Sequence, residues 1–165
     1  MANDNLKMLK TKFVGAFAIC TVFAAALGTA AGSTARADGL AAGLHTGVNQ
    51  LRQACGAVGD DARLTAAAQR HANDMLQNSN YSHTGSDGSS PRARIAEAGY
   101  GGGGSTGEIV YWGTGSGATA SAALDFWMQS PGHRAIILNC AFTTGGFATA
   151  WNGNMMTAVV DFAGP

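Results

Sequence analysis

The chain has 165 residues, of which 12% are charged, and its formal net charge at pH 7 is zero. This length suits one domain with a hydrophobic core of its own. The absence of a basic surplus excludes nucleic acid as an expected partner, because nucleic-acid-binding domains carry clusters of Lys and Arg.

The first 37 residues have the layout of a secretory signal peptide. Three lysines precede an uncharged apolar run over residues 13–31, and Ala35-Arg36-Ala37 fits the small-residue pattern of a cleavage site. A run of this length could also span a bilayer, but Arg36 and Asp38 stand where a retained anchor requires stop-transfer residues. We therefore predict a signal peptide over residues 1–37, a domain over residues 38–165 and no retained transmembrane helix.

Removal of this segment changes the charge and the cysteine content. The remaining domain has six arginines, nine acidic residues and no lysine, so its formal charge is −3. Cys55 and Cys140 are its two cysteines, and neither has a second Cys or His at metal-ligand spacing. Because exported proteins meet an oxidising compartment, a Cys55–Cys140 disulfide is favoured over two buried thiols or a metal site.

Two amphipathic helices are predicted at the start of the domain. The first ends before Gly56, and the second begins after a capping Asp60 or Asp61 and ends near Asn78. Their apolar stripes, at helical spacing, are Leu40, Leu44, Val48, Leu51 and Cys55, then Leu64, Ala67, Ala68, His71 and Met75. Residues 78–91 are rich in Asn, Ser and Gly, which predicts a loop, and a short helix follows over residues 92–98.

The second half of the domain mixes strands and helices. Residues 108–112 predict a strand opened by Glu108, and residues 120–128 predict a helix. Pro131 ends that helix and begins another, with Ser130 as its N-cap and the Ser130 hydroxyl committed to backbone N–H groups. Residues 147–151 and 155–162 predict a hairpin across Asn-Gly-Asn. Helices and strands without βαβ alternation indicate an α+β fold.

Three polar residues stand in separate elements: His83 in the loop, Glu108 at the head of the strand and His133 near the start of the last short helix. Two histidines and a glutamate could ligate a metal ion, or a histidine could act as a general base beside an orienting acid. Their spacing alone decides neither function, because each lies in a separate element.

Five short motifs stand in order along the chain, namely Tyr81-Ser82-His83-Thr84, Asp87-Gly88-Ser89-Ser90-Pro91, Ala98-Gly99-Tyr100, Gly107-Glu108-Ile109 and residues 127–139, which include Ser130-Pro131-Gly132-His133. Together they resemble the bacterial branch of the CAP superfamily, which includes cysteine-rich secretory proteins, venom antigen-five allergens and plant pathogenesis-related proteins. The resemblance implies a three-layer α-β-α sandwich with a small, mainly antiparallel sheet. It covers nearly the whole domain.

The resemblance also implies a cavity lined by two histidines and two acids. His83, Glu108 and His133 match three of these positions, and Ser130 stands at the fourth. These four are the expected ligand-binding residues, and His83, His133 and Glu108 are the expected ligands of zinc or another divalent cation. A second departure is Ile109, where the family usually has Asn. The helix macrodipole should keep the nearby His133 neutral, as metal binding requires.

Three functions follow from these expectations. We favour a secreted, non-catalytic binding module that takes a divalent metal or an apolar ligand, such as a lipid or sterol, in this cavity. The alternatives are a zinc-dependent hydrolase or peptidase using the same residues, and an interaction domain with a vestigial cavity that binds a cell-envelope or host component. We expect a monomer, either extracellular or in the cell envelope. His71 is expected to be a core histidine and His45 to lie on the surface.

Overall fold

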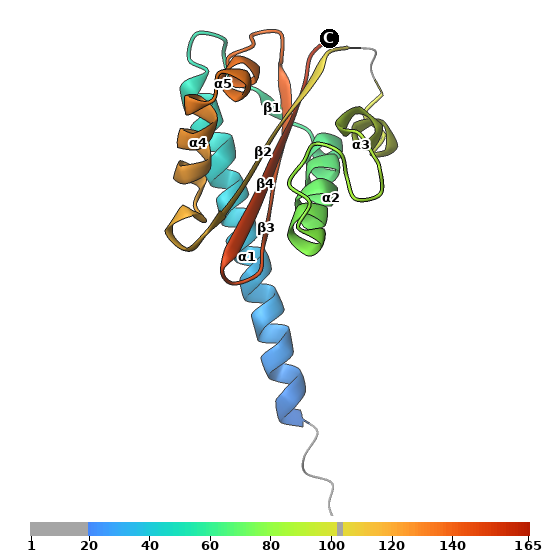
Figure 1. Cartoon of the computed structure of the whole chain (residues 1–165), viewed down its shortest axis with the longest axis vertical. Coiled ribbons are helices and arrows are strands. Elements are labelled where there is room, and N and C mark those ends of the chain that lie inside the picture. Colours follow the sequence, from blue (N-terminus) through green and yellow to red (C-terminus); the bar gives the residue numbers. More distant parts are fainter. Residues whose placement is uncertain (1–19, 102–103) are drawn as a thin grey trace, which may run out of the picture.

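The computed structural model describes residues 20–101 and 104–165, which form three layers. In chain order the elements are α1 (Cys20–Leu51), β1 (Gly59–Asp60), α2 (Ala62–Asn78), α3 (Pro91–Glu97), β2 (Thr106–Thr114), a 3-10 turn η1 (Gly115–Gly117), α4 (Ala120–Gln129), α5 (Pro131–Ile137), β3 (Thr144–Trp151) and β4 (Met155–Ala163). The sheet lies between α1, α4 and α5 on one face and α2 and α3 on the other (Figure 1). The α+β fold and its α-β-α layers are therefore confirmed.

The sheet has four strands in the order β1-β3-β4-β2. β4 pairs antiparallel with both β3 and β2, whereas the two-residue β1 pairs parallel with β3. The predicted hairpin is present, and Gly153 at its tip has a φ of 100°, which glycine adopts without strain. Because β1 is so short, no sequence pattern predicts it.

The two faces of the sheet bury separate apolar cores. The face towards α1, α4 and α5 carries the larger core, which includes Trp127, and the indole N–H of Trp127 donates to the Val110 carbonyl oxygen at 2.8 Å. The other face packs on α2. Its core consists of Ala68, Ala72, Met75, Val110, Ala148, Ala150 and Val159. Burial of both faces fixes the register, since a shift by one residue would exchange them.

α2 lies directly on the sheet at Gly146. A Cβ atom at this position would stand 2.1 Å from the backbone carbon of Leu64, so only glycine permits this approach. Asp61, one of the two predicted capping residues, caps α2 by accepting a hydrogen bond from the Arg63 N–H. The loop over residues 79–90, which carries His83, therefore starts from a firmly seated helix.

The end of α1 differs from the prediction. The helix ends at Leu51 and not at Cys55, and a turn follows. The buried Arg52 side chain donates to the carbonyl oxygens of Phe142 at 2.6 Å and Asn139 at 3.1 Å, and it also bonds that of Ile137. The helix thus ends next to the residue whose side chain binds these distant partners. They also satisfy carbonyl groups at the C-terminal end of α5.

The predicted disulfide is present. Cys55 and Cys140 are bonded, with their Cα atoms 4.8 Å apart and a sequence separation of 85. The bond and Arg52 together join the end of α1 to the segment that follows α5. Since α5 carries His133, both contacts help to place that histidine.

The predicted cleavage site Ala35-Arg36-Ala37 lies within α1, while residues 1–19 of the predicted signal peptide lie outside the described residues. The Ala37 carbonyl oxygen accepts a hydrogen bond from the Thr149 hydroxyl at 2.7 Å. Within residues 20–101 and 104–165, no helix combines the length and apolar character that a membrane crossing needs. Cleavage after Ala37 remains a prediction.

Candidate functional site

The residues of the predicted cavity come from all three layers. His83 lies in the loop before α3, Glu108 in β2 and His133 in α5. β2 is one of the two edge strands of the sheet, so its outer side lies between the two helical layers (Figure 1). Strand β2 begins at Thr106, two residues before the predicted start, which places Glu108 inside the strand and buries its side chain.

His83 and Glu108 form a hydrogen-bonded pair. The Nδ1 atom of His83 lies 2.7 Å from Oε1 of Glu108, and about half of the His83 side chain is exposed (52%). A carboxylate accepts, so Nδ1 carries the proton and Nε2 is the free ring nitrogen. The hydrogen bond and the charge of Glu108 raise the pKa of His83 against the opposing effect of burial.

Arg94 in α3 holds the other oxygen of Glu108. Its Nη2 atom lies 2.6 Å from Oε2 of Glu108 and also donates to the His83 carbonyl oxygen at 3.0 Å. Its Nη1 atom donates to the Ser89 carbonyl oxygen at 2.9 Å. Both charged side chains of this ion pair are buried, with exposed fractions of 1% and 2%. Arg94 therefore fixes the acid and the loop that carries its histidine partner.

His133 is the second imidazole of the site. Burial lowers its pKa, and the charge of nearby His83 lowers it further. Its ring centre is 5.7 Å from that of Phe126 in α4, and its buried Nδ1 atom has no hydrogen-bond partner among the described residues. His133 is therefore expected to be neutral, chiefly because its ring is buried.

Ser130 separates α4 from α5 and occupies the N-cap position of α5, as predicted. The expectation that its hydroxyl is committed to capping is wrong, because the side chain makes no capping hydrogen bond. Its backbone N–H instead bonds to the carbonyl oxygens of Phe126 and Trp127, both at 3.2 Å. At the fourth cavity position, where the resemblance implies an acid, this chain therefore has the Ser130 hydroxyl, which makes no capping hydrogen bond to α5.

The pattern of the cysteine-rich secretory protein family (CAP) matches residues 46–162, which is most of the chain. The chain belongs to this family. No curated protein matches the sequence significantly.

Solved bacterial structures share the CAP fold at low identity. The structure is similar to an outer surface protein of Borrelia burgdorferi, with a TM-score of 0.64 and 23% identity over 73% of this chain and 89% of that one. It is also similar to an extracellular SCP-domain protein of Bacillus anthracis, with a TM-score of 0.66 and 23% identity over 78% and 41%. A cysteine-rich secretory protein of Staphylococcus aureus has a TM-score of 0.60 and 14% identity over 78% and 39%. This CAP domain therefore spans about two fifths of the last two proteins.

A groove of about 360 Å³ lies beside His83 in this CAP domain. The residues that line it come from the His83 loop, α3 and β2, namely His83, Ser90, Pro91, Arg92, Thr106, Gly107 and Glu108. His133 is not among them, so only one of the two predicted imidazoles lines this groove.

The donor set fits a metal ion only in part. Across the two described stretches of the CAP domain, no three His, Cys, Asp or Glu side chains are grouped as metal ligands would be. Both oxygens of Glu108 are hydrogen-bonded, one to His83 and one to Arg94. The carboxylate of Glu108 therefore lies behind the imidazole of His83, a common support for a metal-bound histidine.

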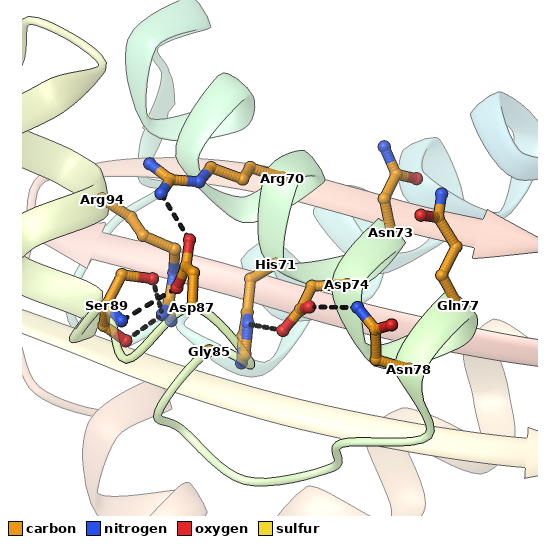
Figure 2. A pocket seen from close by; sticks show the side chains of 10 residues that line it. All are labelled: Arg70, His71, Asn73, Asp74, Gln77, Asn78, Gly85, Asp87, Ser89 and Arg94. Carbon is orange, nitrogen blue, oxygen red and sulfur yellow. Dashed lines mark hydrogen bonds and ion pairs between the residues drawn. The ribbon is translucent and has the colours of Figure 1, made fainter.

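A second hollow, of about 420 Å³, lies between α2 and the His83 loop (Figure 2). His71 lines it but is fully buried, and its Nε2 atom lies 2.8 Å from the Ser82 carbonyl oxygen. Burial is the main cause of its lowered pKa. His71 is therefore a hydrogen-bonded core histidine, as predicted. His45 is half-buried rather than on the surface, with its ring 4.6 Å from that of Phe147.

Two charged residues near the site went unpredicted. Arg94 and Asp161 are both buried, with exposed fractions of 1% and 0%. The sequence contains a signal for Asp161, since it is the one acid in the apolar strand Met155–Ala163. Arg94 directly precedes the buried Ile95, and that proximity to the core is a weaker signal.

Proposed function

We propose that this CAP domain is an extracellular binding module whose cavity holds a divalent metal ion, zinc as the first choice, between the imidazoles of His83 and His133. The hydrogen bond between Glu108 Oε1 and His83 Nδ1, 2.7 Å long, carries the proposal. It directs Nε2 of His83 away from the acid and fixes the tautomer that a metal ligand needs. Glu108 is then an orienting residue and not a third ligand.

The extracellular location is part of the same proposal. The family is described as secretory, and two of the similar structures are described as an outer surface protein and an extracellular protein. The disulfide between Cys55 and Cys140 also favours an oxidising compartment. These observations agree with the predicted signal peptide.

Two protein ligands leave the coordination of a zinc ion incomplete, since catalytic sites usually supply three and structural sites four. The open positions would be filled by water or by donor groups of a bound molecule. Both imidazoles must be neutral to bind, and protons therefore compete with the metal. Because the pKa of His83 is raised and that of His133 is lowered, affinity should fall with decreasing pH, with His83 as the first of the two to protonate.

We expect calorimetric titration at pH 7.5 to find one zinc ion per chain. Replacing either ligand, as His83→Ala or His133→Ala, should weaken binding by at least tenfold. Glu108→Gln should weaken it by about 10–100-fold, because it removes the group that orients His83. His45→Gln is the matched control, since His45 lies on Phe147 and away from the cavity, and it should change the affinity less than twofold. Unchanged binding in both alanine variants would sink the proposal.

An apolar ligand is a second candidate, supported by two exposed aromatic rings, one beside His133 and one beside Tyr81 at the start of the His83 loop. Phe126, beside His133, is 47% exposed, and Trp112, stacked on Tyr81, is 46% exposed. Native mass spectrometry of protein purified from its own host should then find a co-purified lipid or sterol. Phe126→Ser should reduce the bound fraction at least fivefold. If the wild type shows only the mass of the protein itself, the apolar ligand is ruled out and the metal ion is the remaining proposed ligand.

A further inference from the structure

Asp161 is a fully buried acid with no hydrogen-bond partner in the structure. It lies near the end of β4, where the antiparallel register places it opposite Glu108 of β2 and Gly146 of β3. Its exposed fraction is 0%, and neither carboxyl oxygen has a partner. Gly146 has no side chain, so β3 offers Asp161 neither a donor nor a charge. Glu108, by contrast, stands directly across from Asp161 in the antiparallel strand pair, and its side chain is also buried.

The charges around Asp161 do not neutralise it. Glu108 faces it from β2, and Arg94 faces it from α3. The terminal nitrogens of Arg94 are bonded to Glu108, His83 and Ser89, and its Nε atom has no hydrogen-bond partner. On α2, the nearest titratable group to this cluster is His71, whose pKa is lowered, chiefly by burial. Asp161 thus shares a buried site with another acid and receives no hydrogen bond from the cation.

Two carboxylates in this position would repel each other, and an ionised carboxylate without a partner is costly to bury. A single proton resolves both problems, because a protonated carboxyl has an O–H donor and the ionised carboxylate beside it is an acceptor. Glu108 is the better stabilised anion, since it binds Arg94 at 2.6 Å and His83 at 2.7 Å. The proton therefore belongs on Asp161.

We propose that Asp161 is a positioning residue of the cavity. Its carboxyl group stays protonated, and the O–H group donates a hydrogen bond to the carboxylate of Glu108. Glu108 is then held from three directions, by α3, by the His83 loop and by β4. This fixes Oε1 towards His83 and so sets the direction of Nε2. Burial and the charge of Glu108 raise the pKa of Asp161 well above its ordinary value, in agreement with the geometry. The role in binding rests on the proposed function, whereas the protonation does not.

The protonation is tested by comparing the stability of the wild type with that of Asp161→Asn over a range of pH. The folded chain would keep a proton that the unfolded chain loses above about pH 4. The unfolding equilibrium constant of the wild type relative to the variant should therefore rise with pH above about pH 4, by up to about tenfold per pH unit, as long as the folded acid keeps its proton. Asp125→Asn, in an exposed part of α4, is the control and should give a constant ratio. A constant ratio for Asp161→Asn would show an ionised Asp161 and overturn the proposal.

The positioning role is tested by rescue. Asparagine at position 161 keeps a donor for Glu108, whereas Asp161→Val has none. The low-field NMR signal of the His83 Nδ1 proton should persist in Asp161→Asn and weaken or vanish in Asp161→Val. Zinc affinity should stay within about twofold in the first variant and fall about tenfold in the second. Equal behaviour of the two variants would contradict a positioning role. If no variant binds zinc, the NMR signal and the pH dependence still decide this proposal separately from the metal site.

Discussion

Replacing Arg94 with methionine is expected to lower the free energy of unfolding by about 3–5 kcal/mol, as measured by urea denaturation at pH 7. The substitution leaves Glu108 buried and without its cationic partner. It also removes the donors to the carbonyl oxygens of Ser89 and His83, so the loop should loosen. The expected loss thus combines an uncompensated buried charge with unpaired carbonyl groups.

Arg92 provides the control for this experiment, because it lies in the same short helix and is exposed. Arg92→Met should change the free energy of unfolding by less than about 0.5 kcal/mol. Adding Glu108→Gln to Arg94→Met should recover part of the loss, since the buried charge is then gone. A loss below about 1 kcal/mol in Arg94→Met, or no recovery in the double variant, would contradict the described role of the ion pair.

Removing the disulfide is expected to cost about 4–5 kcal/mol in the chain-entropy description, because the bond closes a long loop of 85 residues. The double variant Cys55→Ser/Cys140→Ser should unfold at a lower urea concentration than the oxidised wild type. The wild type in a thiol reductant should have the same lowered midpoint of unfolding. Arg52 still joins the end of α1 to α5, so the variant should keep its native fold at neutral pH. A loss below about 1 kcal/mol would mean that Arg52 alone makes this connection.

Local patterns sufficed to predict the fold class. The apolar stripes marked α2 and α4, the cap at Asp61 marked the start of α2, and Asn-Gly-Asn marked the hairpin turn. These signals are local, because helical spacing and turn chemistry depend on neighbours in sequence. The end of α1 could not be predicted, since the carbonyl groups that bind Arg52 lie some 85–90 residues further along the chain.

The site was predicted less completely than the fold. His83, Glu108 and His133 lie in separate layers, so their spacing in sequence says little, and the resemblance to the CAP family was what singled them out. Arg94 and Asp161 were missed because charged residues are usually exposed. Only the three-dimensional structure shows that both surround the carboxylate of Glu108.

The structure also changes the roles within the site. Ser130 was expected to use its hydroxyl as a cap, and the structure leaves that hydroxyl without a capping bond. Glu108 was expected to ligate metal together with the histidines, and its hydrogen bonds to His83 and Arg94 favour an orienting role instead. Side-chain direction decides the Ser130 cap and supports the proposed role of Glu108, and sequence patterns do not encode it.

Diffraction at the zinc absorption edge, from crystals of the protein grown with zinc chloride, will locate the metal directly. We expect one anomalous peak at about 2.0–2.1 Å from Nε2 of His83 and at a similar distance from an imidazole nitrogen of His133. Glu108 should still accept the hydrogen bond from Nδ1 of His83. Zinc found only on other side chains, with both imidazoles unligated, would contradict the proposed metal site.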